Sequence, residues 1–216
     1  FMYLSVADGI KIFYIDAGKR DGTPMVFVHG WTANLYRWAY QFMEFGKEYR
    51  IIAFDLRGHG RSTKTLRGLD IKTAAEDLKK LVDHLKLDKF ILFGHSMGGM
   101  IALFFAIRYP DMVQKLIICS SAARPTLMKG MSILQDLFQF FTLALIHLLI
   151  GYPFRVWLSV RSFNDSPETT PEAHFHDWRP PNLVAVKYLI NVTRVNLIPY
   201  LYRITAPTLF IFGKRD

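Results

Sequence analysis

Residues 90–99 of this chain read Phe-Ile-Leu-Phe-Gly-His-Ser-Met-Gly-Gly, and this stretch decides how the rest of the sequence is interpreted. The apolar run at 90–93 is typical of a buried strand, and the small residues after it indicate a sharp turn into a helix. Ser96 is at the apex of that turn, with Gly94 and Gly98 two residues to either side. A side chain at either glycine would collide with a neighbouring strand or helix. The pattern predicts a strained turn that presents the hydroxyl of Ser96 as a nucleophile.

An isolated G-x-S-x-G occurs by chance in many proteins, so the flanking segments decide the interpretation. Residues 24–31 read Pro-Met-Val-Phe-Val-His-Gly-Trp, a second buried strand that ends in a glycine-containing turn. Residues 51–62 read Ile-Ile-Ala-Phe-Asp-Leu-Arg-Gly-His-Gly-Arg-Ser, a third strand followed by a glycine-rich loop. We expect further strands at 113–119 and 207–212, and the second of these leads to Asp216. In this order the blocks resemble the α/β-hydrolase superfamily, in its serine esterase and lipase-like branch with a helical cap.

The pattern along the chain predicts an α/β fold with a doubly wound, mostly parallel sheet, because strands alternate with helices. Residues 2–7 and 10–16 alternate apolar with polar side chains around Asp8-Gly9, which predicts an antiparallel hairpin at the sheet edge. Asp70 can cap a helix whose apolar residues recur at spacings of three and four. Ligands of such sheets bind at the carboxyl ends of the parallel strands, where the turns quoted above all fall.

The resemblance divides the chain into three segments. Residues 1–123 are expected to form the N-terminal part of the hydrolase core, and residues 124–196 a helical cap inserted after strand six. Residues 197–216 then return to the core as strand seven and the turn that carries the acid. The family's eighth strand and final helix are expected to be absent from this chain.

One stretch of the expected cap, residues 137–154, is almost continuously apolar. A membrane span is the alternative to a buried cap helix. The run has barely about 18 residues, the minimum for a span, contains Gln139 and His147, and ends in Gly-Tyr-Pro. We therefore expect a cap helix that lines an apolar pocket, and no membrane partner.

Composition limits the class of protein. The chain has 216 residues, of which 51% are apolar, enough for one domain with a modest insertion. Its single cysteine, Cys119, ends an apolar strand and is interpreted as a small buried side chain. A single cysteine and the lack of a visible N-terminal signal predict a cytoplasmic protein. The formal charge of +9 is scattered along the chain, so we expect no nucleic-acid partner.

Ester hydrolysis by a serine needs a nucleophile, a base, an acid that orients the base, and donors for the oxyanion. The resemblance assigns the nucleophile to Ser96 and the oxyanion donors to the backbone N–H groups of Met97 and Trp31. It assigns the orienting acid to Asp216, which follows the last predicted strand. Asp55 is the rival carboxylate, but its place at the end of a strand reads as structural.

The base is not found among these candidates. In this fold the catalytic histidine follows the acid, whereas all seven histidines of this chain precede Asp216. We therefore expect the histidine from outside the chain, with a C-terminal fragment as one source. His174 and His176 could suggest a metal pair, but no third ligand stands out, so neither a metal nor another cofactor is expected.

These residues together predict a serine hydrolase that cleaves carboxylic esters with a hydrophobic acyl or alcohol part through an acyl-enzyme. Its expected partner is a small apolar ester substrate. A serine at position 96, instead of an aspartate, argues against dehalogenase and epoxide hydrolase chemistry. Lactonase, thioesterase and carbon–carbon bond hydrolase activities stay open, as does a catalytically incomplete protein that binds an apolar ligand on the same scaffold.

Overall fold

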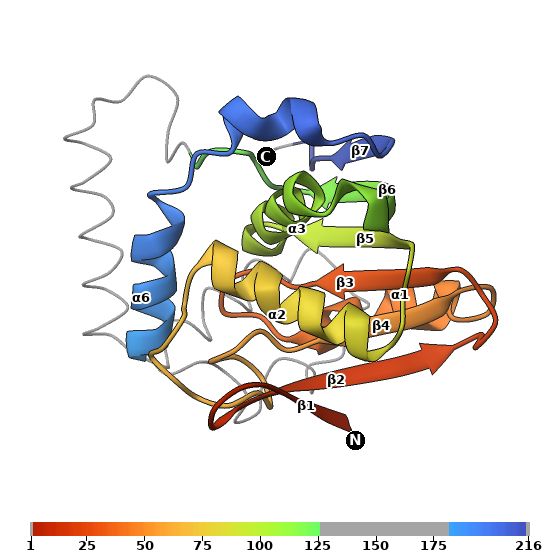
Figure 1. Ribbon diagram of the computed structural model, residues 1–216, viewed down its shortest axis with the longest axis horizontal. Helices are drawn as coiled ribbons and strands as arrows, with labels where there is room; N and C mark the ends of the chain where they lie inside the picture. The colour runs from red at the N-terminus through yellow and green to blue at the C-terminus, as the bar shows by residue number, and fades with distance from the viewer. Residues whose placement is uncertain (1, 126–181, 215–216) are drawn as a thin grey trace.

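The computed structural model describes residues 2–125 and 182–214, which form a sheet covered by helices on both faces (Figure 1). In chain order the elements are β1 (Met2–Ala7), β2 (Ile10–Gly18), β3 (Pro24–Val28), η1 (Leu35–Trp38), α1 (Ala39–Phe45), β4 (Arg50–Phe54), α2 (Ile71–His84), β5 (Phe90–His95), α3 (Met97–Arg108), η2 (Pro110–Met112), β6 (Val113–Cys119), α6 (Asn182–Val192), η4 (Ile198–Arg203) and β7 (Thr208–Ile211). After the β1–β2 hairpin, strands and helices alternate from β3 onward, as the sequence predicts.

The sheet has seven strands within the described ranges, in the order β1-β2-β4-β3-β5-β6-β7. β1 and β2 form the predicted antiparallel hairpin, and β2 is also antiparallel to β4. The remaining pairs are parallel. The prediction of a mostly parallel, doubly wound sheet is confirmed. Because β3, β4 and β5 are neighbours and run in one direction, the loops that follow them meet at one edge.

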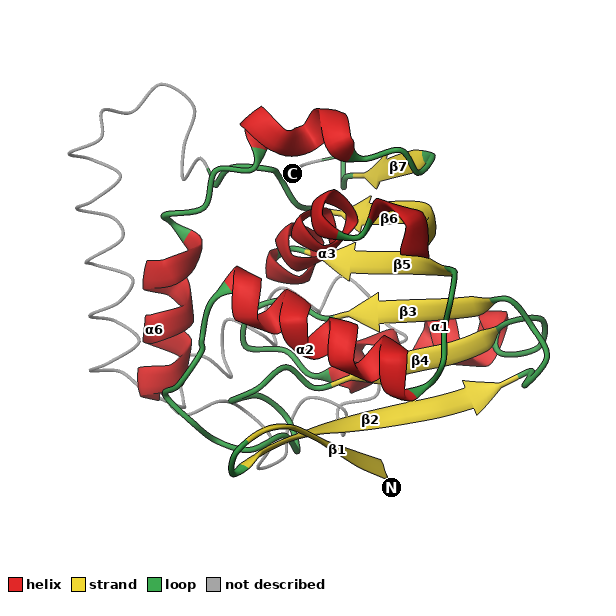
Figure 2. Cartoon of the chain, viewed as in Figure 1, coloured by secondary structure: helices red, strands yellow, loops and turns green. Residues whose placement is uncertain are grey.

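Helices α2 and α3 cover one face of the sheet and α1 covers the other (Figure 2). Alternate strand residues supply the two cores: Val28 and Leu92 face one side, and Phe27 and Phe93 face the other. α2 begins at the predicted cap, where the Asp70 carboxylate accepts a hydrogen bond from the Thr73 N–H at 2.8 Å. Its buried apolar residues have the predicted spacing, because they form the stripe that packs on the sheet.

α6 stands at the carboxyl edge of the parallel strands (Figure 1). It falls inside the range 124–196 that the sequence analysis assigns to the cap, and its Val184, Ala185 and Tyr188 side chains are buried. Residues 137–154 lie outside the described residues. No helix in the described ranges is long and apolar enough to cross a membrane.

A buried ion pair joins the loop after β4 to α2. Arg57 donates from Nε to Asp77 Oδ2 and from Nη2 to Asp77 Oδ1, each at 2.6 Å. The two side chains are only 5% and 3% exposed. Burial raises the pKa of Asp77, and the Arg57 guanidinium opposes that rise. Because neither charge reaches water, each depends on the other for compensation.

We predict that Asp77→Ala lowers the free energy of unfolding by about 3–5 kcal/mol, since it leaves the Arg57 charge buried without its partner. Asp83→Ala is the matched control on the same helix, because Asp83 pairs with Lys79 at the surface and is 52% exposed. That exposed pair is expected to contribute less than about 1 kcal/mol. Urea denaturation measures both variants, and equal losses would contradict the assignment of a structural role to the buried pair.

Candidate active site

Ser96 lies between β5 and α3 with φ 51° and ψ −121°, a backbone conformation that residues other than glycine rarely adopt. Its backbone is held on both sides. The N–H donates to the Cys119 carbonyl at 2.9 Å, and the Ser96 carbonyl accepts from Ser121 Oγ at 2.6 Å and from the Gly99 N–H at 2.8 Å. The predicted strained turn is therefore present, and the surrounding hydrogen bonds maintain it.

Small residues allow three backbone segments to meet at this turn. A Cβ atom on Gly94 would lie 2.5 Å from the Gly98 carbonyl oxygen, and one on Gly98 would lie 2.2 Å from the Val28 carbonyl oxygen. A Cβ on Gly30 would lie 3.2 Å from Ser96 Cβ. The first two contacts explain the glycine spacing around Ser96. The third places the turn at residues 29–31 directly against the serine.

His29 holds that turn. The Leu56 N–H donates to its Nε2 at 3.1 Å, so Nε2 carries no proton and Nδ1–H donates to the Gly30 carbonyl at 2.8 Å. In a planar peptide the N–H points opposite to the C=O. Fixing the Gly30 carbonyl therefore also fixes the direction of the Trp31 N–H. Burial lowers the pKa of His29 to about 4, which keeps the imidazole neutral near pH 7.

Asp55 is fully engaged in holding two loops together. Its Oδ1 accepts from the Leu35 N–H at 2.8 Å, and its Oδ2 accepts from the Arg61 N–H at 2.7 Å. Gly60 packs so closely on the carboxylate that a Cβ there would lie 2.0 Å from Oδ2. The carboxylate joins the loop after β3 to the loop after β4, with both oxygens used by backbone groups.

The structure describes some of the remaining predicted residues and not others. Met97 is the first residue of α3 and is buried, so its backbone N–H is at a helix N-terminus. Asp216 lies outside the described residues, as do His174 and His176. Cys119 is partly buried, which raises the pKa of its thiol. The described part of the chain holds no group of three or more residues suited to bind a metal ion.

Sequence reasoning did not identify two supporting residues of this site. Ser121 fixes the Ser96 carbonyl from the loop after β6, and Ala185 of α6 accepts a hydrogen bond from the Trp31 indole. For the contact between Ser121 and the Ser96 carbonyl, the sequence offers only a serine shortly after the strand at 113–119. The second joins residues 154 positions apart, and no sequence pattern marks it.

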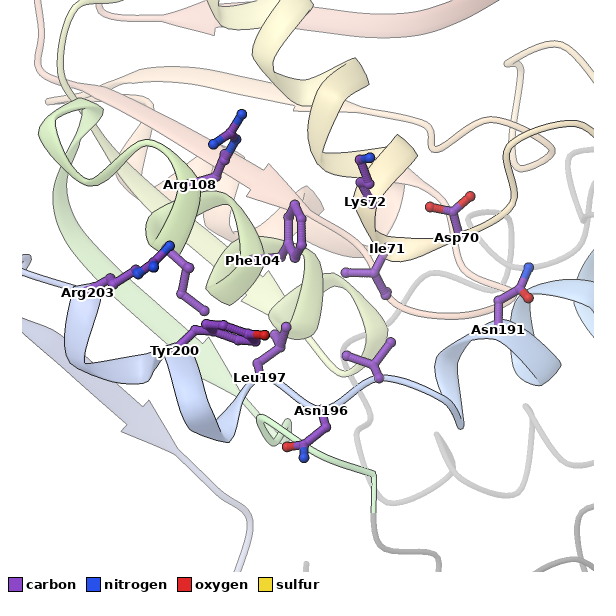
Figure 3. A pocket seen from close by; sticks show the side chains of 12 residues that line it. Asp70, Ile71, Lys72, Phe104, Arg108, Asn191, Asn196, Leu197, Tyr200 and Arg203 are labelled. Carbon is purple, nitrogen blue, oxygen red and sulfur yellow. The ribbon is translucent and has the colours of Figure 1, made fainter.

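A cavity of about 550 Å³ lies between the start of α2, the second half of α3 and the segment 191–203 (Figure 3). Phe104 and Leu197 contribute apolar surface, while Lys72, Arg108 and Arg203 contribute cationic groups. Neither Ser96 nor the two predicted oxyanion donors line it. The chemistry predicted for the Ser96 turn therefore does not take place in this cavity.

The fold and the serine turn define a class of protein, and comparison with known proteins identifies the family. Residues 23–216 match the family model described as the alpha/beta hydrolase fold. The chain belongs to the α/β-hydrolase family, as the sequence blocks predict.

Characterised relatives span several activities. The chain is 40% identical over 119 residues to human epoxide hydrolase 4, a match that covers 54% of this chain and 33% of the relative. It is 39% identical over 129 residues to the bifunctional esterase/perhydrolase DCH of Acinetobacter calcoaceticus, covering 59% and 46%. The chain thus matches less than half the length of either relative. Among solved structures, Est816, an N-acyl homoserine lactone degrading enzyme, is 30% identical with a TM-score of 0.77 and covers 100% of this chain and 82% of its own.

We predict that stability falls as the pH falls from 7 to 5. Burial lowers the pKa of His29 to about 4 and that of His59 well below 6.5. As the pH falls through 6.5, these histidines become protonated in the unfolded chain but stay neutral in the native state. For each histidine the loss becomes steeper as the pH falls below 6.5, and it approaches about 1.4 kcal/mol per pH unit near pH 5. The measurement is the free energy of unfolding in urea at pH 7, 6 and 5.

His29→Gln isolates the contribution of this residue. Asp55 and Asp77 have pKa values raised by burial and change stability in the opposite sense, so the comparison must be made between variants. The pH slope of the variant between 6.5 and 5 should be smaller by about one proton. An unchanged slope would show that His29 is not held neutral by burial.

Proposed function

We propose that this chain contains the nucleophile and the oxyanion donors of a serine hydrolase that cleaves carboxylic esters with a hydrophobic acyl or alcohol part. The observation that supports this most directly is the strained backbone of Ser96, with the Gly30 turn packed on its Cβ. A strained turn at a helix N-terminus presents the hydroxyl to a substrate. The Gly30 turn, which precedes Trp31, packs against Ser96, which precedes Met97, and this supports the assignment of both N–H groups as donors.

In the proposed reaction, Ser96 Oγ attacks the ester carbonyl carbon while its proton passes to a histidine base. The tetrahedral intermediate then collapses, the C–O bond to the alcohol breaks, and the base returns the proton to the leaving oxygen. Water activated by the same base hydrolyses the acyl-enzyme and regenerates Ser96. We assign Asp216 to orient this histidine.

The oxyanion hole in this proposal consists of the N–H groups of Met97 and Trp31. Met97 is at the N-terminus of α3, where the helix dipole favours negative charge. The His29–Gly30 hydrogen bond sets the direction of the Trp31 N–H before substrate arrives. Loss of one such donor typically costs about 10²–10³ in kcat, so both are expected to matter.

The identity of the nucleophile favours esters over epoxides, although epoxide hydrolase 4 is among the relatives. An aspartate that opens an epoxide forms an ester, which water can cleave. A serine that opened an epoxide would form an ether, and the enzyme would not turn over. The relatives named as an esterase and as a lactone-degrading enzyme act on acyl–oxygen bonds, the bond type that a serine nucleophile can cleave repeatedly.

We predict that Ser96→Ala lowers kcat/KM for p-nitrophenyl butyrate and octanoate by at least about 10³-fold, because the nucleophile is lost. It should also abolish covalent labelling by a fluorophosphonate, detected by intact-mass spectrometry. Ser5→Ala, at an exposed serine of β1, is the matched control and should keep wild-type rates. A wild-type protein that neither labels nor hydrolyses these esters would favour the alternative, a scaffold that only binds apolar ligands.

A further inference from the structure

The side chain of Trp31 anchors the proposed oxyanion turn to a distant helix. Its indole Nε1–H donates to the Ala185 carbonyl of α6 at 2.8 Å. The backbone N–H of the same residue is a donor of the proposed oxyanion hole. One residue therefore contributes its backbone to the proposed reaction and its side chain to α6.

α6 is well placed to act as a fixed support. Val184 is 2% exposed and Ala185 and Tyr188 are fully buried. Val184 fills the space over the loop after β4: a Cβ on Gly58 would lie 2.5 Å from Val184 Cγ1. The helix is thus seated on the loop after β4, and the Ala185 carbonyl of its first turn is the acceptor for the indole.

A second set of contacts leads from α6 to the same turn. The Tyr188 ring packs edge-on against His59, with centroids 5.2 Å apart, and the His59 ring packs on His29 at 5.3 Å. His29 in turn donates to the Gly30 carbonyl. Both ends of the peptide that carries the Trp31 N–H are therefore supported from α6, one by a hydrogen bond and the other by packed rings.

We propose that Trp31 is a positioning residue. The hydrogen bond from its indole to the Ala185 carbonyl of α6 fixes the direction of the Trp31 backbone N–H. This inference rests on the proposed function. Oxyanion donors act only when they lie about 2.7–3.1 Å from the developing charge, so a shift of a few tenths of an ångström weakens them. The Trp31 side chain is partly buried and packs against the core, and the bond to Ala185 adds a directional contact at its indole. The docking of α6 thus stabilises the transition state more than the bound ester.

The test is Trp31→Phe in the intact protein, which keeps an aromatic ring and removes the indole N–H. Trp38→Phe is the matched control: the same substitution is made at an indole whose buried Nε1 has no hydrogen-bond partner in the described part of the chain. Trp31→Phe should lower kcat for p-nitrophenyl butyrate and the rate of fluorophosphonate labelling by about 10–100-fold, a partial loss of one donor. KM should change less than about threefold, because the ester ground state needs the donor least.

Hydrogen exchange provides a second readout. Amides of residues 182–192 should exchange faster in Trp31→Phe than in Trp38→Phe, because only the first variant removes a hydrogen bond to α6. If both variants label and turn over alike, the inference is wrong while the proposed function stands. Faster exchange with an unchanged kcat would reduce the bond to a structural contact and also overturn it. A wild-type protein that is not labelled at all would overturn the proposed function, and this inference with it.

Discussion

Helix α3 can begin directly after Ser96 only because no side chain separates its first turn from strand β3. A Cβ on Gly98 would collide with the Val28 carbonyl, and one on Gly94 would collide with the backbone of Gly98. This backbone contact forces the chain to turn within one residue, and Ser96 takes the strained conformation that results. The position of the serine, the Met97 N–H and the adjoining Gly30 turn all depend on it.

Buried polar groups connect the loops around this turn to one another and to α2. The Asp55 carboxylate joins the loops after β3 and β4, the Arg57–Asp77 fork ties the second loop to α2, and the neutral imidazole of His29 links both loops again. Each group would be costly to bury alone, and each is satisfied by a partner from another segment. The site is therefore rigid for electrostatic reasons, in addition to the packing of the sheet.

Much of the fold could be predicted because its signals are local. The hairpin at β1 and β2, the helix that begins after Asp70, and the strands at 90–95 and 113–119 each follow from periodicity or a cap within a few residues. The order of the strands, the two faces of the core and the seating of α6 have no such signal. The roles of Ser96, Met97 and Trp31 remain proposals, and Asp216 lies outside the described residues.

The sequence by itself determined where the serine turn lies and why its neighbours must be glycine, since steric exclusion at a tight turn is written in adjacent residues. Tertiary structure alone decided which groups hold that turn. The proton of His29 is assigned by the Leu56 N–H, and the Trp31 indole finds its acceptor 154 residues away at Ala185. Hydrogen bonds between distant segments depend on how the chain packs in three dimensions, and such packing leaves no periodic mark on the sequence.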